Sequence, residues 1–284
     1  MRINPYGGTM LLRVLIWLLL AFPAFLECAF SLPQKPVEFV VFIPSYKNEK
    51  WVQQNLESVV KQTYPYWSIY YVNDCSPDNT GLLVDQFVQL HGIQDRCKIV
   101  HNTTRKLAMQ NIYESIHNIA PDKVVVMLDG DDWFPHENVL GRLARAYSNK
   151  KIWLTYGNYL TWPEDKGTTC AEIPKKVRKE SLFRSYKWVA SHLRSFYAKL
   201  FQQIKKEDLQ WKDGQFFPMT YDLAIMFPML EMAKDKHFLF IPEVLYIYNI
   251  SNPLNDFKVN LKLQEEIERY IRSRPIYEPI KTLF

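Results

Sequence analysis

The sequence predicts an α/β fold with a mostly parallel, twisted sheet and helices on both faces. In the first half of the chain, short β-rich runs alternate with segments that carry apolar residues at helical spacing. The β-rich runs are too apolar to have one face in water, which is typical of strands that helices cover on both sides. The chain has 284 residues, of which 48% are hydrophobic, and this is enough for one domain with a full-sized core.

The elements of the first half follow from local patterns. An apolar, β-rich run predicts a strand at residues 38–44, and residues 49–62 place Val52, Leu56 and Val59 on one face of a helix. The same reasoning predicts strands at 68–72, 98–100 and 124–128, and helices at about 80–90 and 106–116. Because a helix separates each strand from the next, the strands are expected to pair in parallel.

The second half of the chain is less regular. Its expected elements are a helix at residues 195–204, a turn at Asp213-Gly214, a helix that follows Asp222, a strand at 244–248 and a polar terminal helix from about residue 258. We see no internal repeat and no convincing linker, so we expect one domain at residues 37–284, in which the alternation loosens beyond Asn158.

The first thirty residues are not expected to belong to the fold. Arg2 and Arg13 precede an apolar run at residues 14–22, and Pro23 and small residues follow, which is the order of a secretory signal. The run is shorter than the ~20 apolar residues of a spanning helix. A cleaved signal at residues 1–30 is therefore favoured over a signal-anchor, and a buried helix of the domain is the third interpretation. We expect a secreted or exported protein, a protein attached to the membrane through this segment only, or a cytosolic one if the true start lies downstream.

Charge and cysteine content exclude several classes of function. The net charge is +5, and Lys and Arg are spread along the chain except in the run Lys175–Lys179. We interpret that run as a solvated face, so nucleic acid is not an expected partner. Outside the presumed signal the cysteines are Cys75, Cys97 and Cys170, with no CxxC or HExxH motif. A disulfide framework or a zinc site is therefore not expected.

Polar and acidic side chains follow three of the predicted strands. They are found in Ser45–Asn48, Asn73–Ser76 and Asp129–Asp132. In parallel α/β sheets, ligands bind at the carboxyl ends of the strands. We therefore expect these three segments to meet at one edge of the sheet and to form a ligand site.

The acidic turn Asp129-Gly130-Asp131-Asp132 carries the strongest chemical signal. Its three carboxylates repel one another, so they need a cation or generous solvation. A hard divalent ion such as Mg²⁺ prefers oxygen ligands and usually shares its coordination between one or two carboxylates and substrate phosphates. The alternative is a solvated acidic turn that caps the helix after Pro135. The turn thus predicts a site for Mn²⁺ or Mg²⁺ together with a phosphate-bearing ligand.

The acidic turn resembles the DxD motif of family-2 glycosyltransferases, which have the GT-A fold. Three earlier segments are similar to that family's opening segment in order and spacing: residues 41–46, residues 56–63 and residues 72–80. The resemblance is good from about residue 37 to 147 and much weaker afterwards. It implies a GT-A domain at residues 37–284, with a nucleotide-sugar-binding half at 37–147 and an acceptor-binding half at 148–284.

The resemblance also implies roles in donor binding. Tyr46 would lie against the nucleotide base, Asp74 would hydrogen-bond the base, and Arg105 would pair with the diphosphate. Asp74 could instead form an Asx-turn or cap the helix at Thr80, and Arg105 could be a surface arginine. Asn73 stands where the family usually has Asp, which leaves the identity of the base open.

The metal and the catalytic base are assigned in the same way. Asp132 is the expected direct metal ligand, Asp129 is a second and less certain one, and Asp131 would contact the ribose or reach the metal through water. Asp222 matches the position of the family's base, which takes the proton of the acceptor hydroxyl. The family commonly has Glu-Asp there, whereas this chain has Tyr221-Asp222, and the helix dipole also favours an Asp in a first turn.

Two polar segments in the second half have less specific interpretations. In Ser191–Arg194, His192 could line an acceptor pocket, but we expect a structural histidine with its hydrogen bonds satisfied. Residues Asn249–Asp256 could form a loop that closes over the donor, and a plain connecting loop is the favoured interpretation.

Taken together, the resemblance implies a metal-dependent, inverting hexosyltransferase. It would move a sugar from a nucleotide-diphosphate donor, with UDP the expected nucleotide, to a hydroxyl of a glycan, lipid or protein. The missing spans and the missing QxxRW motif indicate a non-processive enzyme. A nucleotidyltransferase is the alternative enzyme, although Ser45–Glu49 contains no glycine for a phosphate loop. A catalytically inactive sugar- or nucleotide-binding module is the alternative from another class.

Overall fold

A computed structural model describes residues 35–254 and 260–284, and the fold is that of the unit Val37–Phe284. The signal or signal-anchor expected at residues 1–30 lies outside the described residues. In the described ranges, no helix is both long and apolar enough to cross a membrane. Cys75, Cys97 and Cys170 are all unpaired.

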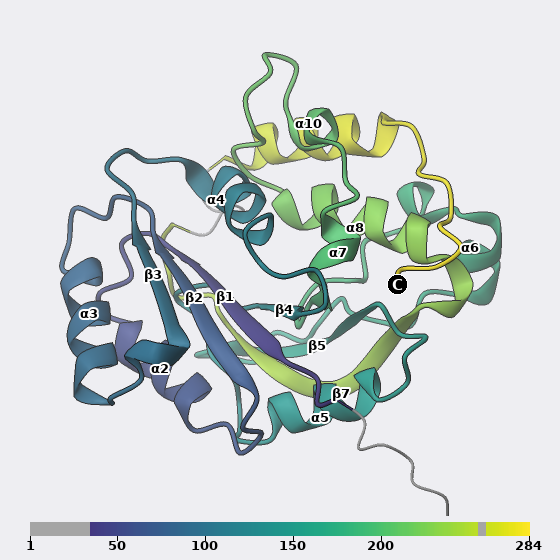
Figure 1. The fold of residues 1–284 in the computed structure, drawn as a ribbon. Coiled ribbons are helices and arrows are strands. Elements are labelled where there is room, and N and C mark those ends of the chain that lie inside the picture. The colour runs from purple at the N-terminus through teal and green to yellow at the C-terminus, as the bar shows by residue number, and fades with distance from the viewer. Residues whose placement is uncertain (1–34, 255–259) are drawn as a thin grey trace, which may run out of the picture. The chain divides into compact units, whose positions relative to one another are not determined.

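The unit is built on a seven-stranded sheet with the order β3-β2-β1-β4-β6-β5-β7 (Figure 1). The strands are β1 (Phe39–Ser45), β2 (Trp67–Asn73), β3 (Cys97–His101), β4 (Val124–Met127), β5 (Leu154–Trp162), β6 (Ser195–Tyr197) and β7 (Phe238–Asn249). Strands β1 to β4 pair in parallel, as do β5 and β7, and β6 runs antiparallel to β4 and β5. The predicted mostly parallel sheet is therefore confirmed.

Helices cover both faces of this sheet. They are α2 (Val52–Val60), α3 (Thr80–Leu90), α4 (Leu107–Ile116), α5 (Val139–Tyr147), α6 (Lys175–Glu180), α7 (Ala198–Phe201), α8 (Tyr221–Ala233) and α10 (Leu261–Ser273). Helices α2, α3 and α5 lie on one side, and α4, α7 and α8 lie on the other (Figure 1). All four residues of β4 are buried, so this strand has no polar alternation.

The helix expected at residues 195–204 is wrong in its first part. Ser195–Tyr197 form strand β6, and the helix α7 begins only at Ala198. The three strand residues are buried between β4 and β5, and backbone hydrogen bonds to both neighbours outweigh the local helical pattern. Arg194 therefore lies directly before a central strand.

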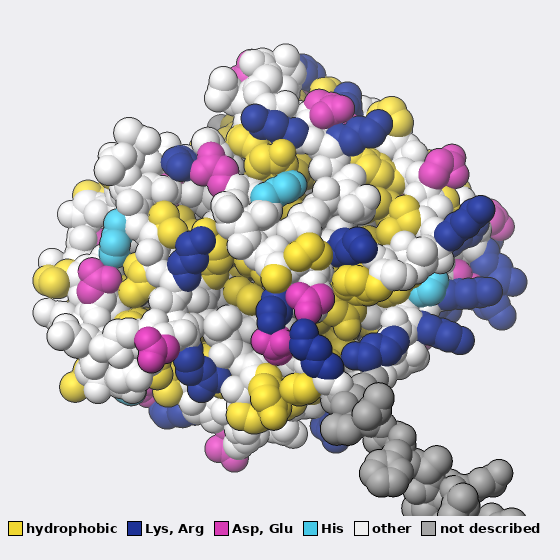
Figure 2. Space-filling model, viewed as in Figure 1, with side chains coloured by type: hydrophobic (Ala, Val, Ile, Leu, Met, Phe, Trp, Pro, Cys, Tyr) yellow, Lys and Arg dark blue, Asp and Glu magenta, His cyan; other side chains and the backbone are white. Residues whose placement is uncertain are grey.

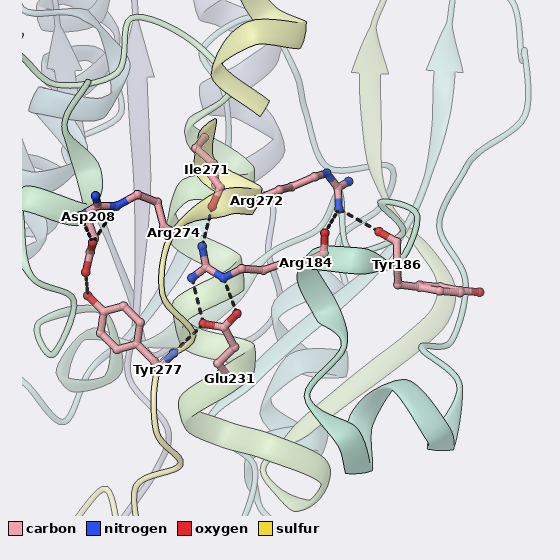
Figure 3. A network of polar contacts seen from close by, with 8 residues as sticks. All are labelled: Arg184, Tyr186, Asp208, Glu231, Ile271, Arg272, Arg274 and Tyr277. Carbon is pink, nitrogen blue, oxygen red and sulfur yellow. Dashed lines mark hydrogen bonds and ion pairs between the residues drawn. The ribbon is translucent and has the colours of Figure 1, made fainter. Parts of the chain in front are cut away.

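A buried polar network ties α8 to the C-terminal segment (Figure 3). Arg184 donates to both carboxylate oxygens of Glu231 on α8, at 2.6 and 2.9 Å, and to the Ile271 carbonyl of α10 at 2.6 Å. The Tyr277 N–H also donates to Glu231, at 3.0 Å, and the Tyr277 hydroxyl donates to Asp208 at 2.6 Å. The network fixes the helix that carries Asp222 in its first turn.

The basic run lies on the short helix α6. Lys175, Lys176 and Lys179 are exposed, while Val177 faces the core. Figure 2 shows Lys and Arg side chains gathered at the edge of the molecule where α6 lies. The run has the exposure expected of a solvated helix face.

Candidate functional site

A cleft of about 350 Å³ lies at the carboxyl ends of β1, β2 and β4. The seven candidate residues from the sequence all line it: Tyr46, Asp74, Arg105, Asp129, Asp131, Asp132 and Asp222. The first six come from loops of the parallel half of the sheet, and Asp222 comes from the start of α8. The topology thus brings residues from both halves of the chain to one site.

The acidic turn is held tightly against the loop after β1. A Cβ on Gly130 would lie 2.5 Å from the Ser45 hydroxyl and 2.7 Å from the Asn48 amide nitrogen, so this position needs glycine. The buried Asn55 amide of helix α2 donates to the backbone oxygens of Asp129, at 2.9 Å, and Asp132, at 2.7 Å. These contacts fix the backbone of the turn from which the three carboxylates project.

The carboxylate of Asp132 has no exposed surface. Its Oδ2 accepts a hydrogen bond from the Tyr246 hydroxyl at 2.5 Å, and its Oδ1 accepts one from the Asn249 N–H at 2.7 Å. Burial raises its pKa well above the ordinary value, and the charges of Asp131 and Asp129 raise it further. Mutual repulsion within the turn is thus not fully relieved by the surrounding protein.

The other two carboxylates are partly exposed and also engaged. Asp129 Oδ1 accepts from the Tyr221 hydroxyl at 2.6 Å, and Asp131 Oδ2 accepts from the Asn252 amide at 2.6 Å. Asn249 also donates to the Asp131 carbonyl, at 3.2 Å. In its described part, the loop expected to be a plain connection therefore holds the acidic turn in place. Its residues 255 and 256 lie outside the described chain.

The acidic turn has the oxygen ligands that a hard cation prefers, but its side chains are not arranged as a ready-made metal site. Within residues 35–254 and 260–284, no three His, Cys, Asp or Glu side chains are grouped so that they could hold a metal ion. Three crowded carboxylates nevertheless supply the oxygen ligands that Mg²⁺ and Mn²⁺ prefer. Asp129 is the more accessible of the two expected ligands, because its side chain is 22% exposed and Asp132 is fully buried.

Arg194 is a site residue that the sequence reasoning missed. Its side chain is only 2% exposed, and its guanidinium lies 3.9 Å from Asp129 and 3.8 Å from Asp222. It also donates to the Tyr221 hydroxyl at 3.4 Å. A fixed positive charge thus stands between the acidic turn and the candidate base. The sequence signal was its place directly before strand β6, and the helix expected at 195–204 concealed that strand.

Asp222 lies in the first turn of α8 with about a quarter of its side chain exposed. Burial raises its pKa, and the charge of Arg194 acts in the opposite direction. A carboxylate with a raised pKa that opens into a cleft can accept a proton from a bound hydroxyl. The geometry is compatible with both a base and a dipole-stabilised first-turn Asp.

Asp74 does not cap α3, because Asp78 accepts from the Thr80 N–H and hydroxyl at 3.1 and 2.6 Å. Asp74 instead accepts from the N–H groups of Lys106 and Leu107, both at 2.8 Å, at the start of α4. Asn102 donates a third hydrogen bond at 2.8 Å. Burial would raise the pKa of Asp74, but these hydrogen bonds outweigh it, so the pKa is lowered and the group is ionised at neutral pH.

Tyr46 and Arg105 form a pair at the rim of the cleft. The Arg105 guanidinium lies 3.8 Å from the centre of the Tyr46 ring, which is a cation–π contact. The pair joins the loop after β1 to the loop before α4. Arg105 is exposed, yet it is stacked on the cleft wall and not directed away from it.

His192 is not the satisfied structural histidine that we expected. It is 8% exposed, lines the cleft and stacks on the rings of Tyr246 and Tyr248, with centroids 4.3 and 5.1 Å away. Its Nδ1 has no hydrogen-bond partner among the described residues. Burial lowers its pKa well below the ordinary value and the charge of Arg194 adds to this, so the imidazole is neutral.

The sequence matches known proteins over most of its length. Residues 40–204 match the family model described as glycosyl transferase family 2. The glycosyltransferase GlyG of Streptococcus pneumoniae serotype 4 is 27% identical over 224 residues, which are 73% of this chain and 69% of GlyG. An Escherichia coli protein, the UDP-Glc:alpha-D-GlcNAc-diphosphoundecaprenol beta-1,3-glucosyltransferase WfgD, is 29% identical over 119 residues, which are 42% of this chain and 44% of WfgD.

Solved structures share the fold at low sequence identity. The complex of S. aureus TarS 1-349 with UDP-GlcNAc has a TM-score of 0.53 and 16% identity, over 75% of this chain and 58% of that one. The mannosyltransferase PcManGT from Pyrobaculum calidifontis, in complex with GDP-Man and Mn²⁺, has a TM-score of 0.55 and 16% identity, over 91% of this chain and 72% of that one. Both likenesses show the GT-A fold.

Proposed function

Because the chain belongs to glycosyl transferase family 2, we propose that its cleft transfers a sugar from a nucleotide-diphosphate donor to an acceptor hydroxyl, with inversion. One observation carries this proposal. The acidic turn and Asp222 come from opposite halves of the chain, and both face the same buried guanidinium of Arg194, at 3.9 and 3.8 Å. The group that would bind the donor phosphates and the base that would deprotonate the acceptor hydroxyl are thus held in one cleft.

The donor half supports a nucleotide diphosphate, and UDP is the nucleotide we propose. The base would lie against Tyr46, and Arg105 would pair with the diphosphate, for which a planar guanidinium is suited. A carboxylate has about four acceptor positions. Asp74 uses three of them in hydrogen bonds to the chain, which leaves capacity for a uracil N–H. Asp131 would contact the ribose. TarS, a fold neighbour, is described in complex with UDP-GlcNAc.

We also propose dependence on Mn²⁺ or Mg²⁺. Asp129 and Asp132 would hold the ion, Asp129 with an accessible carboxylate and Asp132 after exchange of its hydrogen bond from Tyr246. When bound, such an ion neutralises charge on a leaving diphosphate. PcManGT and GalNAc-T7, both fold neighbours, are described with Mn²⁺.

In the proposed reaction, Asp222 takes the proton of the acceptor hydroxyl while the acceptor oxygen forms a bond to the anomeric carbon. The bond from that carbon to the diphosphate oxygen breaks on the opposite face, and the nucleoside diphosphate leaves. Arg194 holds Asp222 beside the acidic turn. Arg105 balances the charge of the leaving group. A single transfer per encounter, without processive extension, is proposed.

The test is a panel of nucleotide sugars incubated with the purified chain, with Mn²⁺ or with a chelator. Release of UDP or GDP that needs metal supports the proposal, and nuclear magnetic resonance of the transfer product reports its anomeric configuration. Binding without turnover would indicate a catalytically inactive module. Release of pyrophosphate in place of the diphosphate would indicate a nucleotidyltransferase.

For the acceptor and for the location of the protein, more than one possibility is proposed. A glycan, a lipid or a protein could carry the acceptor hydroxyl, and the name of WfgD specifies a lipid-linked sugar for that relative. Export or membrane attachment through residues 1–30 stays a prediction. Fractionation of cells that express the full chain, followed by N-terminal sequencing, would distinguish a cleaved signal, a retained anchor and a cytosolic protein.

A further inference from the structure

The acceptor half of the cleft contains buried polar atoms that lack partners. Among the described residues of this half, five that line the cleft each have a buried polar side-chain atom without a hydrogen-bond partner. These atoms are Trp188 Nε1, His192 Nδ1, Arg194 Nε, Thr220 Oγ1 and Gln264 Oε1. His192 is 8% exposed and Thr220 is 4% exposed. Folded proteins pair nearly all such atoms, because an unpaired buried polar group costs free energy. A cluster of five such atoms in one half of the cleft indicates a ligand that supplies the missing hydrogen bonds.

Thr220 provides a second, independent observation. Its backbone has a φ of 61°, in the left-handed region that a β-branched residue rarely adopts. Strain of this kind persists where the surrounding structure maintains it, and it clusters at functional sites. The strained conformation places the unpartnered hydroxyl at the cleft, directly before Tyr221 and Asp222.

The chemistry of these atoms selects an uncharged ligand. The Trp188 N–H can only donate, the Gln264 oxygen can only accept, and Thr220 and a neutral imidazole can do either. Sugar hydroxyls also both donate and accept, whereas phosphates and carboxylates only accept. Arg194 is the one Lys or Arg among the described residues that line this half. Its charge faces the carboxylates of Asp129 and Asp222, and its unpartnered Nε–H is a further donor for a hydroxyl oxygen.

The walls around these atoms are aromatic. His192 stacks on Tyr246 and Tyr248, and Tyr248 and Trp188 also line the cleft. Small-molecule sites typically combine such aromatic walls with a few polar groups that fix orientation. Rings of this kind suit the C–H faces of a sugar.

We propose that Trp188, His192, Thr220 and Gln264 form an acceptor subsite that binds an uncharged sugar residue through its hydroxyl groups. The subsite rests on the proposed function, because it lies beside Asp222, the group that would deprotonate the acceptor. The acceptor recognised here is therefore the terminal neutral sugar of a glycan or glycolipid. A phosphate, which only accepts hydrogen bonds, is not the group that enters the subsite.

The experiment uses the full chain saturated with UDP and Mn²⁺. Saturation-transfer nuclear magnetic resonance measures the binding of methyl glycosides of glucose, galactose and N-acetylglucosamine, and of glucose 6-phosphate and a serine-containing peptide. At least one neutral glycoside should bind. His192→Phe keeps the stacked ring and removes both nitrogens, and Thr220→Gly removes the hydroxyl and relieves the strain. Each should weaken glycoside binding about tenfold, the loss expected for one well-placed hydrogen bond to a buried group.

Stability measurements keep this test interpretable. Thr220→Gly should raise the melting temperature while it weakens glycoside binding, since glycine adopts a positive φ without strain. Lys176→Ala, at an exposed residue of α6, is the control and should change neither property. Unchanged glycoside binding in both cleft variants would overturn the proposal, as would preference for glucose 6-phosphate or the peptide. Failure of UDP itself to bind would instead contradict the proposed function.

Discussion

The guanidinium of Arg194 lies 3.8 Å from the carboxylate of Asp222 and is almost completely buried. One residue precedes strand β6, and the other lies in the first turn of α8. The same guanidinium lies 3.9 Å from Asp129 in the acidic turn. Arg194 therefore links the two groups to which we assign the most demanding chemistry, and a change at Arg194 should affect both.

Arg194→Met should lower kcat/KM by about a hundredfold, because a small displacement of a catalytic group is enough for such a loss. Arg194→Lys keeps the charge but lacks the planar fork, and should retain part of the activity. Steady-state kinetics with the best donor of the panel provide the measurement. Arg142→Met, at a surface pair with Glu243, is the control. Wild-type kinetics in Arg194→Met would contradict the linking role.

The pH dependence of transfer should report Asp222. A base acts in its ionised form, so kcat/KM should fall as the pH drops through its pKa. Burial raises that pKa, and the acid limb should therefore lie above the ordinary range of an Asp. Since Arg194 opposes the effect of burial, Arg194→Met should move the limb to higher pH. Profiles are measured at saturating Mn²⁺.

Asp222→Asn provides the complementary result. It should lower kcat by about 10²–10⁴, the usual contribution of a positioned base. The residual activity should no longer show the acid limb. An Asp222→Asn variant with the wild-type profile would show that another group accepts the proton, and would leave Asp222 the role of a first-turn Asp.

Tyr246→Phe should tighten Mn²⁺ binding about fivefold, which corresponds to one ordinary hydrogen bond of about 1 kcal/mol. The Tyr246 hydroxyl occupies Asp132 Oδ2 at 2.5 Å, so the ion must displace it if Asp132 is a ligand. Isothermal titration with Mn²⁺ measures the change. Tyr156→Phe is the control, because the Tyr156 hydroxyl is bonded to Ala171 outside the cleft. Weaker Mn²⁺ binding in Tyr246→Phe would contradict this prediction and would indicate that the hydroxyl supports the turn, because it also accepts from the Asp129 N–H at 3.2 Å.

Glu231→Gln should destabilise the fold by about 3–5 kcal/mol, because it leaves the buried Arg184 without its counter-charge. The side chain of Arg184 is 6% exposed and that of Glu231 is fully buried. The double change Arg184→Met and Glu231→Leu should recover much of the loss, since it removes both buried charges. Denaturant unfolding gives the free energies. Glu57→Gln, in an exposed pair with Lys61, should cost at most about 0.5 kcal/mol. Equal losses of unfolding free energy in Glu231→Gln and Glu57→Gln would refute this prediction.

Local sequence patterns were sufficient for the first half of the fold. Strands β1, β2 and β4 are mostly apolar, and helix α2 carries a regular apolar face, so each of these elements is recognisable by itself. The rule that parallel strands present ligands at their carboxyl ends then placed Tyr46, Asp74 and the acidic turn together. These conclusions need only short-range periodicity and a general property of parallel sheets.

Long-range packing decided the rest. Strand β6 has three residues and is defined by its neighbours β4 and β5, and strand β5 has a partly exposed second half, so neither has a clear local pattern. The partners of the acidic turn, Arg194 and Tyr246, are distant in sequence and became visible only through these pairings.

The sequence by itself thus determined the α/β class, the acidic turn and its likeness to a family of transferases. Only the tertiary structure decided that both oxygens of Asp132 are engaged, that Arg194 faces Asp222, and that His192 lines the cleft with an unpartnered nitrogen. The physical reason is that periodicity records which side of an element is buried. Hydrogen bonds and charge pairs between elements depend on how those sides are brought together in space.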